Sequence, residues 1–235
     1  MTLKIFQRKS VLAGLLGLIL LSFFGTLALS AAIFPQHYDW RYRVMSNLLS
    51  PRDNPHYYWL ASIGVAISGL CLLPFAYYLQ GILRAVSFLG AYITCGGFLV
   101  GGTGLICASL VVPQHVHALL GMPRPHELLA RTAAGFMAMG MLAGCWCVWK
   151  GRGRIFSWGL IWIWILLTVL PLSGLICSEL LLLLSQAHFD WATSVGRMFR
   201  GTVFWHLGFW EWSGAVAVYL FLCAGVFLFD DKAGG

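Results

Sequence analysis

Histidine is the residue type whose placement in this sequence points most directly to chemistry. The chain holds seven histidines, and each lies between long apolar stretches or at the edge of one. They are His37, His56, His115, His117, His126, His188 and His206. Neutral imidazole is a common zinc ligand. The candidate metal ligands are His115, His117, His126 and His206. Their spacing is not that of the H-E-x-x-H signature, so zinc or another divalent metal is one alternative among several.

Arginine accompanies histidine in the same stretches of the chain. Guanidinium groups bind phosphate and carboxylate through paired hydrogen bonds, so this composition predicts a site for an anionic lipid or a small anionic ligand. The residues predicted to line that site are Arg41, Arg43, Arg131, Arg197, Arg200, Asp39 and Asp190.

Several ionisable residues fall inside apolar stretches or at their edges. A charged side chain at that depth costs a few kcal/mol unless it is paired. We therefore expect the cations of Arg131 and His206 to face the carboxylates of Glu179 and Glu211 in one cluster. The candidate catalytic residues, as metal ligands or acid–base groups, are His117, His206, Glu179 and Glu211. The alternative is an ion-pair group that only holds the helices together.

Membrane-spanning helices are the elements that must position these residues. Only 10% of the residues are charged and 60% are hydrophobic, whereas about a quarter are charged in soluble globular domains. This composition excludes an ordinary soluble domain, and the continuous apolar runs exclude the alternating strands of a membrane β-barrel. A helical span needs about 20 apolar residues. The stretches that meet this length are 10–34, 57–80, 86–112, 128–148, 156–184 and 208–229.

The sequence thus predicts an all-α polytopic membrane protein, one domain of six helices arranged as three hairpins. Every lysine falls on the side of the two termini, where the connections 81–85 and 150–155 are short and basic. Because cytoplasmic loops are rich in Lys and Arg, we expect both termini in the cytoplasm. The polar site then faces outward from a bacterial inner membrane. The first apolar run, about 25 residues, exceeds the 7–15 of a signal peptide, which predicts a retained anchor helix.

The outer loops resemble one another in sequence. The first contains Gln36-His37-Tyr38-Asp39-Trp40, and the third contains Gln186-Ala187-His188-Phe189-Asp190-Trp191. The second begins Pro113-Gln114-His115. These matches favour three repeats of a two-helix unit, as is common in polytopic proteins; chance among short motifs is the alternative.

Glycine and cysteine give packing information. Gly97-x-x-x-Gly101 and Gly140-x-x-x-Gly144 predict close contact between the third and fourth spans, because such pairs let helix backbones approach. The cysteines all lie within the apolar stretches, so no disulfide framework is expected.

Other chemical interpretations have less support in the sequence. His117 with Arg124, and Arg200 with His206 and Glu211, faintly resemble two motifs of the lipid phosphatases related to phosphatidic acid phosphatase. Histidine replaces the first lysine of that pattern, and the Ser-Gly-His motif is missing. Haem would need two facing histidines within the bundle, and a transporter would need broken helices in both halves. Nucleic acid is not an expected partner, because the positive charge follows membrane topology.

Loop one and the second span carry a further resemblance. The segment Ser46-Asn47-Leu48-Leu49-Ser50-Pro51-Arg52-Asp53-Asn54-Pro55-His56, followed by Ser68-Gly69-Leu70 and Leu73-Pro74-Phe75, resembles bacterial six-helix membrane proteins of unknown function near the DRAM/Sfk-like superfamily. The match covers about 45 residues and moderately specific motifs. It implies a polytopic inner-membrane protein and does not choose among the chemistries.

The leading functional prediction is an outer site that binds or transforms an anionic lipid or small ligand. One alternative is a non-catalytic structural or accessory subunit, whose outer loops would dock a membrane-protein partner. Another is a metal-dependent membrane hydrolase. Membrane lipids are the expected partners in the leading case.

Overall fold

The computed structural model describes residues 8–111, 125–152, 158–199 and 201–227, and within these ranges the regular structure is helical. The helices in chain order are α1 (Lys9–Ile19), the π-helical turn η2 (Leu20–Gly25), α2 (Thr26–Ala32), α3 (Ser46–Leu49), α4 (Tyr58–Leu83), α5 (Phe88–Leu110), α7 (Pro125–Lys150), α8 (Trp158–Gln186), α9 (Asp190–Phe199), the 3₁₀ turn η3 (Val203–Trp205) and α10 (Leu207–Phe227).

Six of these segments are long and apolar enough to cross a membrane, which confirms the predicted all-α polytopic fold. They are Lys9–Ala32, Tyr58–Leu83, Phe88–Leu110, His126–Lys150, Leu166–Gln186 and Leu207–Phe227. The first span joins α1, η2 and α2 without a break. It ends two residues earlier than the sequence predicts, because Phe34 leaves the helix and is buried in a small core beneath the next loop.

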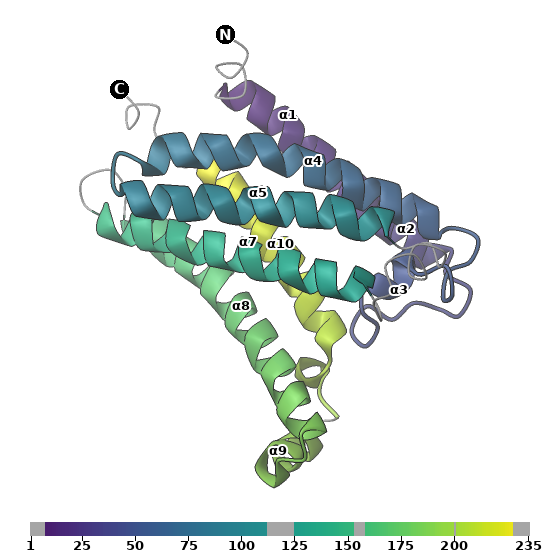
Figure 1. Cartoon of the computed structure of the whole chain (residues 1–235). Helices are drawn as coiled ribbons and strands as arrows, with labels where there is room; N and C mark the ends of the chain where they lie inside the picture. The colour runs from purple at the N-terminus through teal and green to yellow at the C-terminus, as the bar shows by residue number, and fades with distance from the viewer. Residues whose placement is uncertain (1–7, 112–124, 153–157, 200, 228–235) are drawn as a thin grey trace.

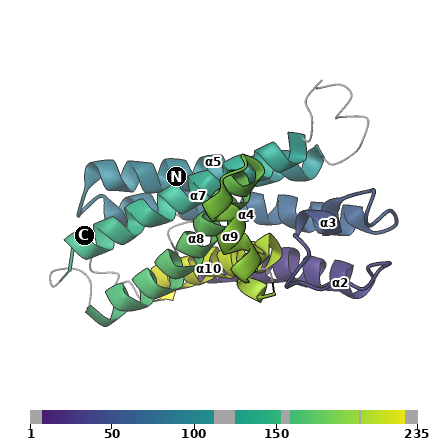
Figure 2. The ribbon, with the colours of Figure 1, turned by 90° about the horizontal axis from the view of Figure 1, so that it is seen from below.

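The spans form two groups around a shared core. Helices α4, α5 and α7 lie side by side in one layer, and α10 crosses behind them (Figure 1). Figure 2 shows α2 and α10 on the same side of that layer. Helix α8 contacts α10 but leans away from α7 toward its far end, where α9 follows it (Figure 1). The start of α1 and the end of α10 lie at one end of the bundle; the opposite end, which carries α3 and α9, is called the loop end below.

Three aromatic rings fix the middle of the bundle. Phe221 of α10 is fully buried, with its ring centroid 4.1 Å from Trp164 of α8 and 5.7 Å from Phe98 of α5. Both pairs are nearly parallel, with interplanar angles of 22° and 21°. Stacked aromatic pairs add about 0.5–1.5 kcal/mol beyond their buried area, so these rings join one helix of the α4–α5–α7 layer to both helices of the last hairpin.

Glycine sets the contact between α5 and α7, as the sequence predicts. A methyl group on Gly97 would stand 2.5 Å from the carbonyl oxygen of Phe136 and 2.7 Å from the Cα of Gly140. The two backbones therefore touch, which small residues permit at helix crossings in membranes. In the pair Gly140-x-x-x-Gly144 of α7, the second glycine makes a different contact: Gly144 faces the ring of Phe221 on α10.

The connection between α2 and α4, residues 33–57, is a folded cap, and we call it loop one. Its residues Phe34, Tyr38, Leu48 and Leu49 are buried against Leu27 and other residues of the first two spans. Asn54 is fully buried and its amide donates to Ser30 Oγ (2.8 Å) and to the carbonyl of Leu48 (3.1 Å). Loop one thus has an apolar core and internal hydrogen bonds, and its backbone is held against the bundle.

Candidate functional site

Loop one rests on the first turns of α10. The backbone of Arg43 lies directly against Gly208, where any side chain would collide with it. The hydroxyl of Tyr38 donates to the carbonyl of Arg43 (3.0 Å) and accepts from the indole Nε1 of Trp212 (3.2 Å). Burial raises the pKa of Tyr38 to about 12; the hydrogen bond from Trp212 opposes that shift and the charge of Glu211 adds to it. Tyr38 is therefore a neutral hydroxyl that ties the loop to the helix.

Two predicted catalytic residues take part in the same junction. The Glu211 carboxylate accepts a 2.7 Å hydrogen bond from the backbone N–H of Met45. The imidazole of His206 meets the ring of Tyr42 edge to face, with centroids 4.5 Å apart. Both side chains therefore contact loop one, and their observed interactions position it on α10.

An apolar groove lies beside this junction, between α2, α8 and α10. Its volume is about 710 Å³. Its wall is almost entirely apolar, with residues Ala28, Ala31, Tyr38, Trp40, Leu167, Pro171, Phe209, Trp212, Ser213, Val216, Ala217 and Leu220. Tyr38 and Trp40 come from loop one, so the groove runs from the membrane-spanning helices to the loop end.

Two arginines, Arg41 and Arg43, follow these groove residues in the chain. The first is paired with a carboxylate, and the second contacts only neutral groups among the residues that the structure describes. Arg41 makes a bidentate pair with Asp39, through Nε (2.9 Å) and Nη2 (2.7 Å). This hydrogen bonding holds the pKa of Asp39 at about 2. Arg43 donates from Nη2 to the neutral amide of Gln36 (3.3 Å), and its guanidinium lies over the ring of Phe34. Within the described chain, the positive charge of Arg43 is not matched by a carboxylate.

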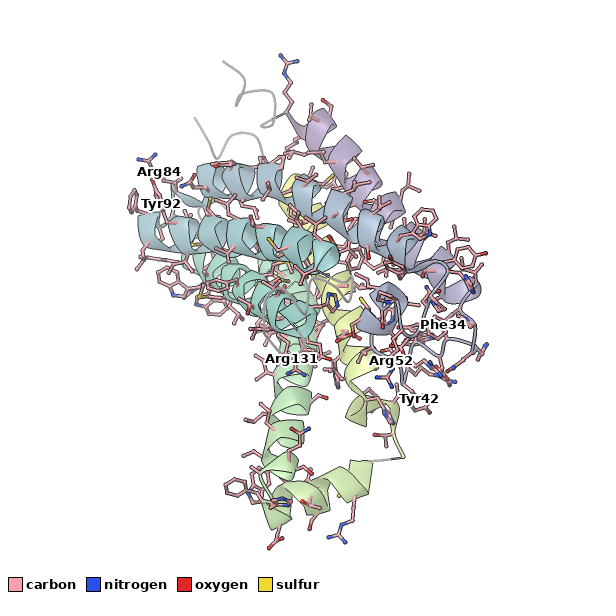
Figure 3. All side chains as sticks on the ribbon, turned by 45° about the vertical axis from the view of Figure 1, so that its right-hand side comes forward. Phe34, Tyr42, Arg52, Arg84, Tyr92 and Arg131 are labelled. Carbon is pink, nitrogen blue, oxygen red and sulfur yellow. The ribbon has the colours of Figure 1, made fainter. Side chains whose placement is uncertain are left out.

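The other predicted binding residues lie elsewhere at the loop end. Arg131 is exposed near the start of α7, and Figure 3 shows it separated from the labelled loop-one residues Tyr42 and Arg52. Asp190 begins α9, and Arg197 lies in its last turn, 3.5 Å from Ser194 Oγ. The structure therefore brings Asp39, Arg41 and Arg43 together and leaves α9 as a separate surface.

Some predicted residues lie outside what the structure describes. They are His115, His117 and Arg200, together with the side chain of Glu179. The four-residue cluster of Arg131, His206, Glu179 and Glu211 therefore stays a prediction, although the structure places two of its members against loop one.

The predicted metal ligands have other roles where they are described. His126 Nδ1 lies 2.8 Å from the carbonyl of Ala108, which links the start of α7 to the end of α5. No group of three or more His, Cys, Asp or Glu residues is arranged to hold a metal in the described part of the chain. A site that uses His115 and His117 would fall outside these ranges.

The two copies of the His-aromatic-Asp-Trp motif share a backbone feature. His37 has φ 53° and His188 has φ 61°, and they are the only non-glycine residues with positive φ among those described. Histidine is one of the few side chains enriched in this left-handed region. In each copy the histidine turns the chain so that the next residues begin a helical turn. This likeness supports the predicted repeat between loops one and three.

Sequence reasoning missed the groove. Trp212 and Phe209 lie in an apolar span, where nothing in the sequence separates a groove wall from a lipid-facing side. The repeated motif was the available signal for Tyr38 and Trp40, since both lie within it.

Comparison with known proteins identifies no relative of this chain. No protein-family model, no curated protein and no solved structure matches the chain.

Proposed function

We propose that this protein binds an anionic lipid at the loop end of the bundle. The acyl chain of the lipid lies in the groove, and its headgroup lies at loop one. The observation that carries the proposal is that an apolar groove of about 710 Å³ reaches Tyr38 and Trp40. The next arginines in the chain, Arg41 and Arg43, stand at that end. An apolar cavity with a few polar groups at one edge is the usual form of a ligand site.

Arg43 is the main headgroup contact in this proposal. Its guanidinium donates to one neutral side chain, so further N–H donors face an incoming phosphate, and paired donation is the geometry that phosphate favours. Arg41 contributes less, because Asp39 already neutralises it. His206 and Glu211 support the site by holding loop one, so we propose binding and not a chemical transformation.

The loop end would face outward from a bacterial inner membrane, following the basic character of the connections at the opposite end. An anionic lipid of the outer leaflet could then enter the groove sideways from the bilayer.

Native mass spectrometry of the detergent-purified protein tests this proposal. Phosphatidylglycerol and phosphatidylcholine with identical acyl chains are added in turn. We expect a preference for phosphatidylglycerol that falls about fivefold in Arg43→Gln, because a basic residue near an anionic surface is worth about 1 kcal/mol. Arg84→Gln is the matched control, since Arg84 lies at the opposite end of the bundle (Figure 3).

A second variant separates a lipid from a small soluble anion. Val216→Trp fills the groove from α10. If it lowers lipid binding but leaves glycerol phosphate binding unchanged, the groove holds an acyl chain. Equal binding of the two lipids, or equal effects of Arg43→Gln and Arg84→Gln, would contradict the proposal and favour the accessory-subunit alternative. Stoichiometric zinc by elemental analysis would instead favour a hydrolase.

A further inference from the structure

Helix α9 holds a distinctive place in the chain. It follows α8 directly and leads through η3 into α10, so it connects two membrane-spanning helices at the loop end. Figure 3 shows α9 lying crosswise at the end of α8. Because both neighbours are spans, α9 must lie near the boundary between hydrocarbon and water.

The ten residues of α9 present three different sides. Ala192 and Gly196 are buried, and they lie one turn apart on the side that packs against α8 and η3. On a second side Trp191 is 55% exposed and Met198 is 79% exposed. The third side is polar, and its residues are Asp190, Thr193, Ser194 and Arg197. An amphipathic helix with a free apolar side is typical of the membrane interface.

The two motif copies differ in how far the described chain covers the aromatic residue that follows histidine. In loop one the aromatic residue after histidine, Tyr38, is 8% exposed because α10 covers it. At the corresponding position before α9, Phe189 is 49% exposed. The backbone turn at the histidine is the same in both copies. The described chain thus leaves Phe189 without the cover that Tyr38 receives, while Trp191 (55% exposed) is as exposed as its counterpart Trp40 (50%), and Met198 is more exposed than either.

We infer that α9 lies flat in the interface of the bilayer leaflet at the loop end, with Trp191 and Met198 among the upper acyl chains and Arg197 among the headgroups. Tryptophan is enriched at this depth because its ring is apolar and its N–H is polar. Arg197 suits the adjacent layer of phosphates. The lipid surface is therefore what covers the exposed side of α9. This inference does not depend on the occupant of the groove.

Hydroxyl-radical footprinting of the wild-type protein in nanodiscs is the first test. Met139 of the spanning helix α7 is 45% exposed on the protein surface and serves as the reference for a side chain in lipid. We expect Met198 to oxidise as slowly as Met139, although more of its surface is exposed. Oxidation of Met198 many times faster than that of Met139 would show that α9 stands in water and would overturn the inference.

Nitroxide labels then map the two sides of the helix. They are attached at Trp191→Cys, Thr193→Cys, Arg197→Cys and Met198→Cys in a chain whose native cysteines are replaced. Oxygen, which concentrates in lipid, should collide more with labels at 191 and 198, and a water-soluble nickel chelate more with those at 193 and 197. Equal access of the chelate to all four labels would contradict the inference. Immobile labels at 191 and 198, shielded from both reagents, would identify a protein partner instead. If the cysteine-free chain does not fold, footprinting of the wild type decides.

Discussion

Tyr38 shows how one side chain can join a loop to a membrane helix. Its hydroxyl both accepts from Trp212 and donates to the carbonyl of Arg43. A net hydrogen bond contributes about 0.5–1.5 kcal/mol, and a buried partner left unsatisfied costs about 1–3 kcal/mol. Tyr38 also forms part of the groove wall. A single residue therefore links the stability of the cap to the shape of the proposed site.

The raised pKa of Tyr38 gives a pH prediction. Its ordinary value is 10.0 and the folded value is about 12. Between these values the folded protein keeps the proton that the unfolded chain loses, so this tyrosine lowers stability as the pH rises from 10 toward 12. Phenolate absorbance of wild type minus that of Tyr38→Phe should show a titration near pH 12. A difference titration near pH 10 would mean that the hydroxyl is open to water.

Asp39 controls the charge that loop one presents. Its pKa of about 2, set first by the hydrogen bonds from Arg41, keeps the ion pair intact as the pH falls from 7 to 4. The favourable contribution of this pair is lost only as the pH falls from about 4 toward 2. Arg41 is therefore neutralised under all ordinary conditions.

Removing that carboxylate should strengthen lipid binding, if the proposed site is correct. Asp39→Asn keeps an oxygen that can accept from the backbone N–H of Arg41 but frees its guanidinium. We expect the affinity for phosphatidylglycerol to rise about fivefold, because each added basic charge contributes about 1 kcal/mol to the binding free energy. Asp190→Asn, the same motif position before α9, is the control and should change affinity much less. Equal increases in both variants would indicate a general charge effect and would count against a site at loop one.

At the scale of the elements, the α5–α7 contact depends on the absence of side chains. Gly97 lies against Phe136 and Gly140, whereas its neighbour Gly96 has no atom within 4 Å of where a Cβ would stand. Alanine substitution at these two positions therefore distinguishes the effect of helix packing from the effect of helix propensity.

Gly97→Ala should destabilise the protein, and Gly96→Ala should not. The added methyl of Gly97→Ala forces α5 and α7 apart, and overpacking of this kind costs about 1–3 kcal/mol. The Gly96 variant gains helix propensity, by up to about 1 kcal/mol. Thermal unfolding in detergent should show a lower Tm for the first variant alone. Equal Tm values for the two variants would show that α5 and α7 do not touch at Gly97.

At the scale of the whole molecule, an even number of spans places the start of the first span and the end of the last span on the same side of the membrane. The start of α1 and the end of α10 lie together, opposite loop one and α9 (Figure 1). The connections on that side are basic, and the positive-inside rule relates such connections to the cytoplasm.

Reporter fusions check this orientation. Green fluorescent protein fused after residue 235 should fluoresce in a bacterial host, and alkaline phosphatase inserted in loop one after Pro55 should be active. These outcomes follow because the first reporter folds in the cytoplasm and the second needs the oxidising exterior. The opposite pattern of reporter activity would show that the protein has the reverse orientation, with the proposed lipid site in the inner leaflet.

The sequence by itself determined the spans and the close contact between α5 and α7. Apolar runs such as 57–80 and 208–229 are long enough to satisfy their backbone hydrogen bonds only as helices in lipid, and the structure has Tyr58–Leu83 and Leu207–Phe227 there. Glycine spacing marked the α5–α7 crossing because local sequence decides how closely a backbone can be approached.

Only the tertiary structure decided where loop one lies and what it encloses. The contacts of Tyr38 with Trp212 and of Met45 with Glu211 join residues more than 160 positions apart, and no local pattern encodes such a distance. The groove has the same cause, because α2, α8 and α10 form its walls from three separate parts of the chain. In lipid an apolar side chain suits a groove wall, a core or the bilayer equally well, so composition fixes that these helices span the membrane, and their packing alone fixes what they face.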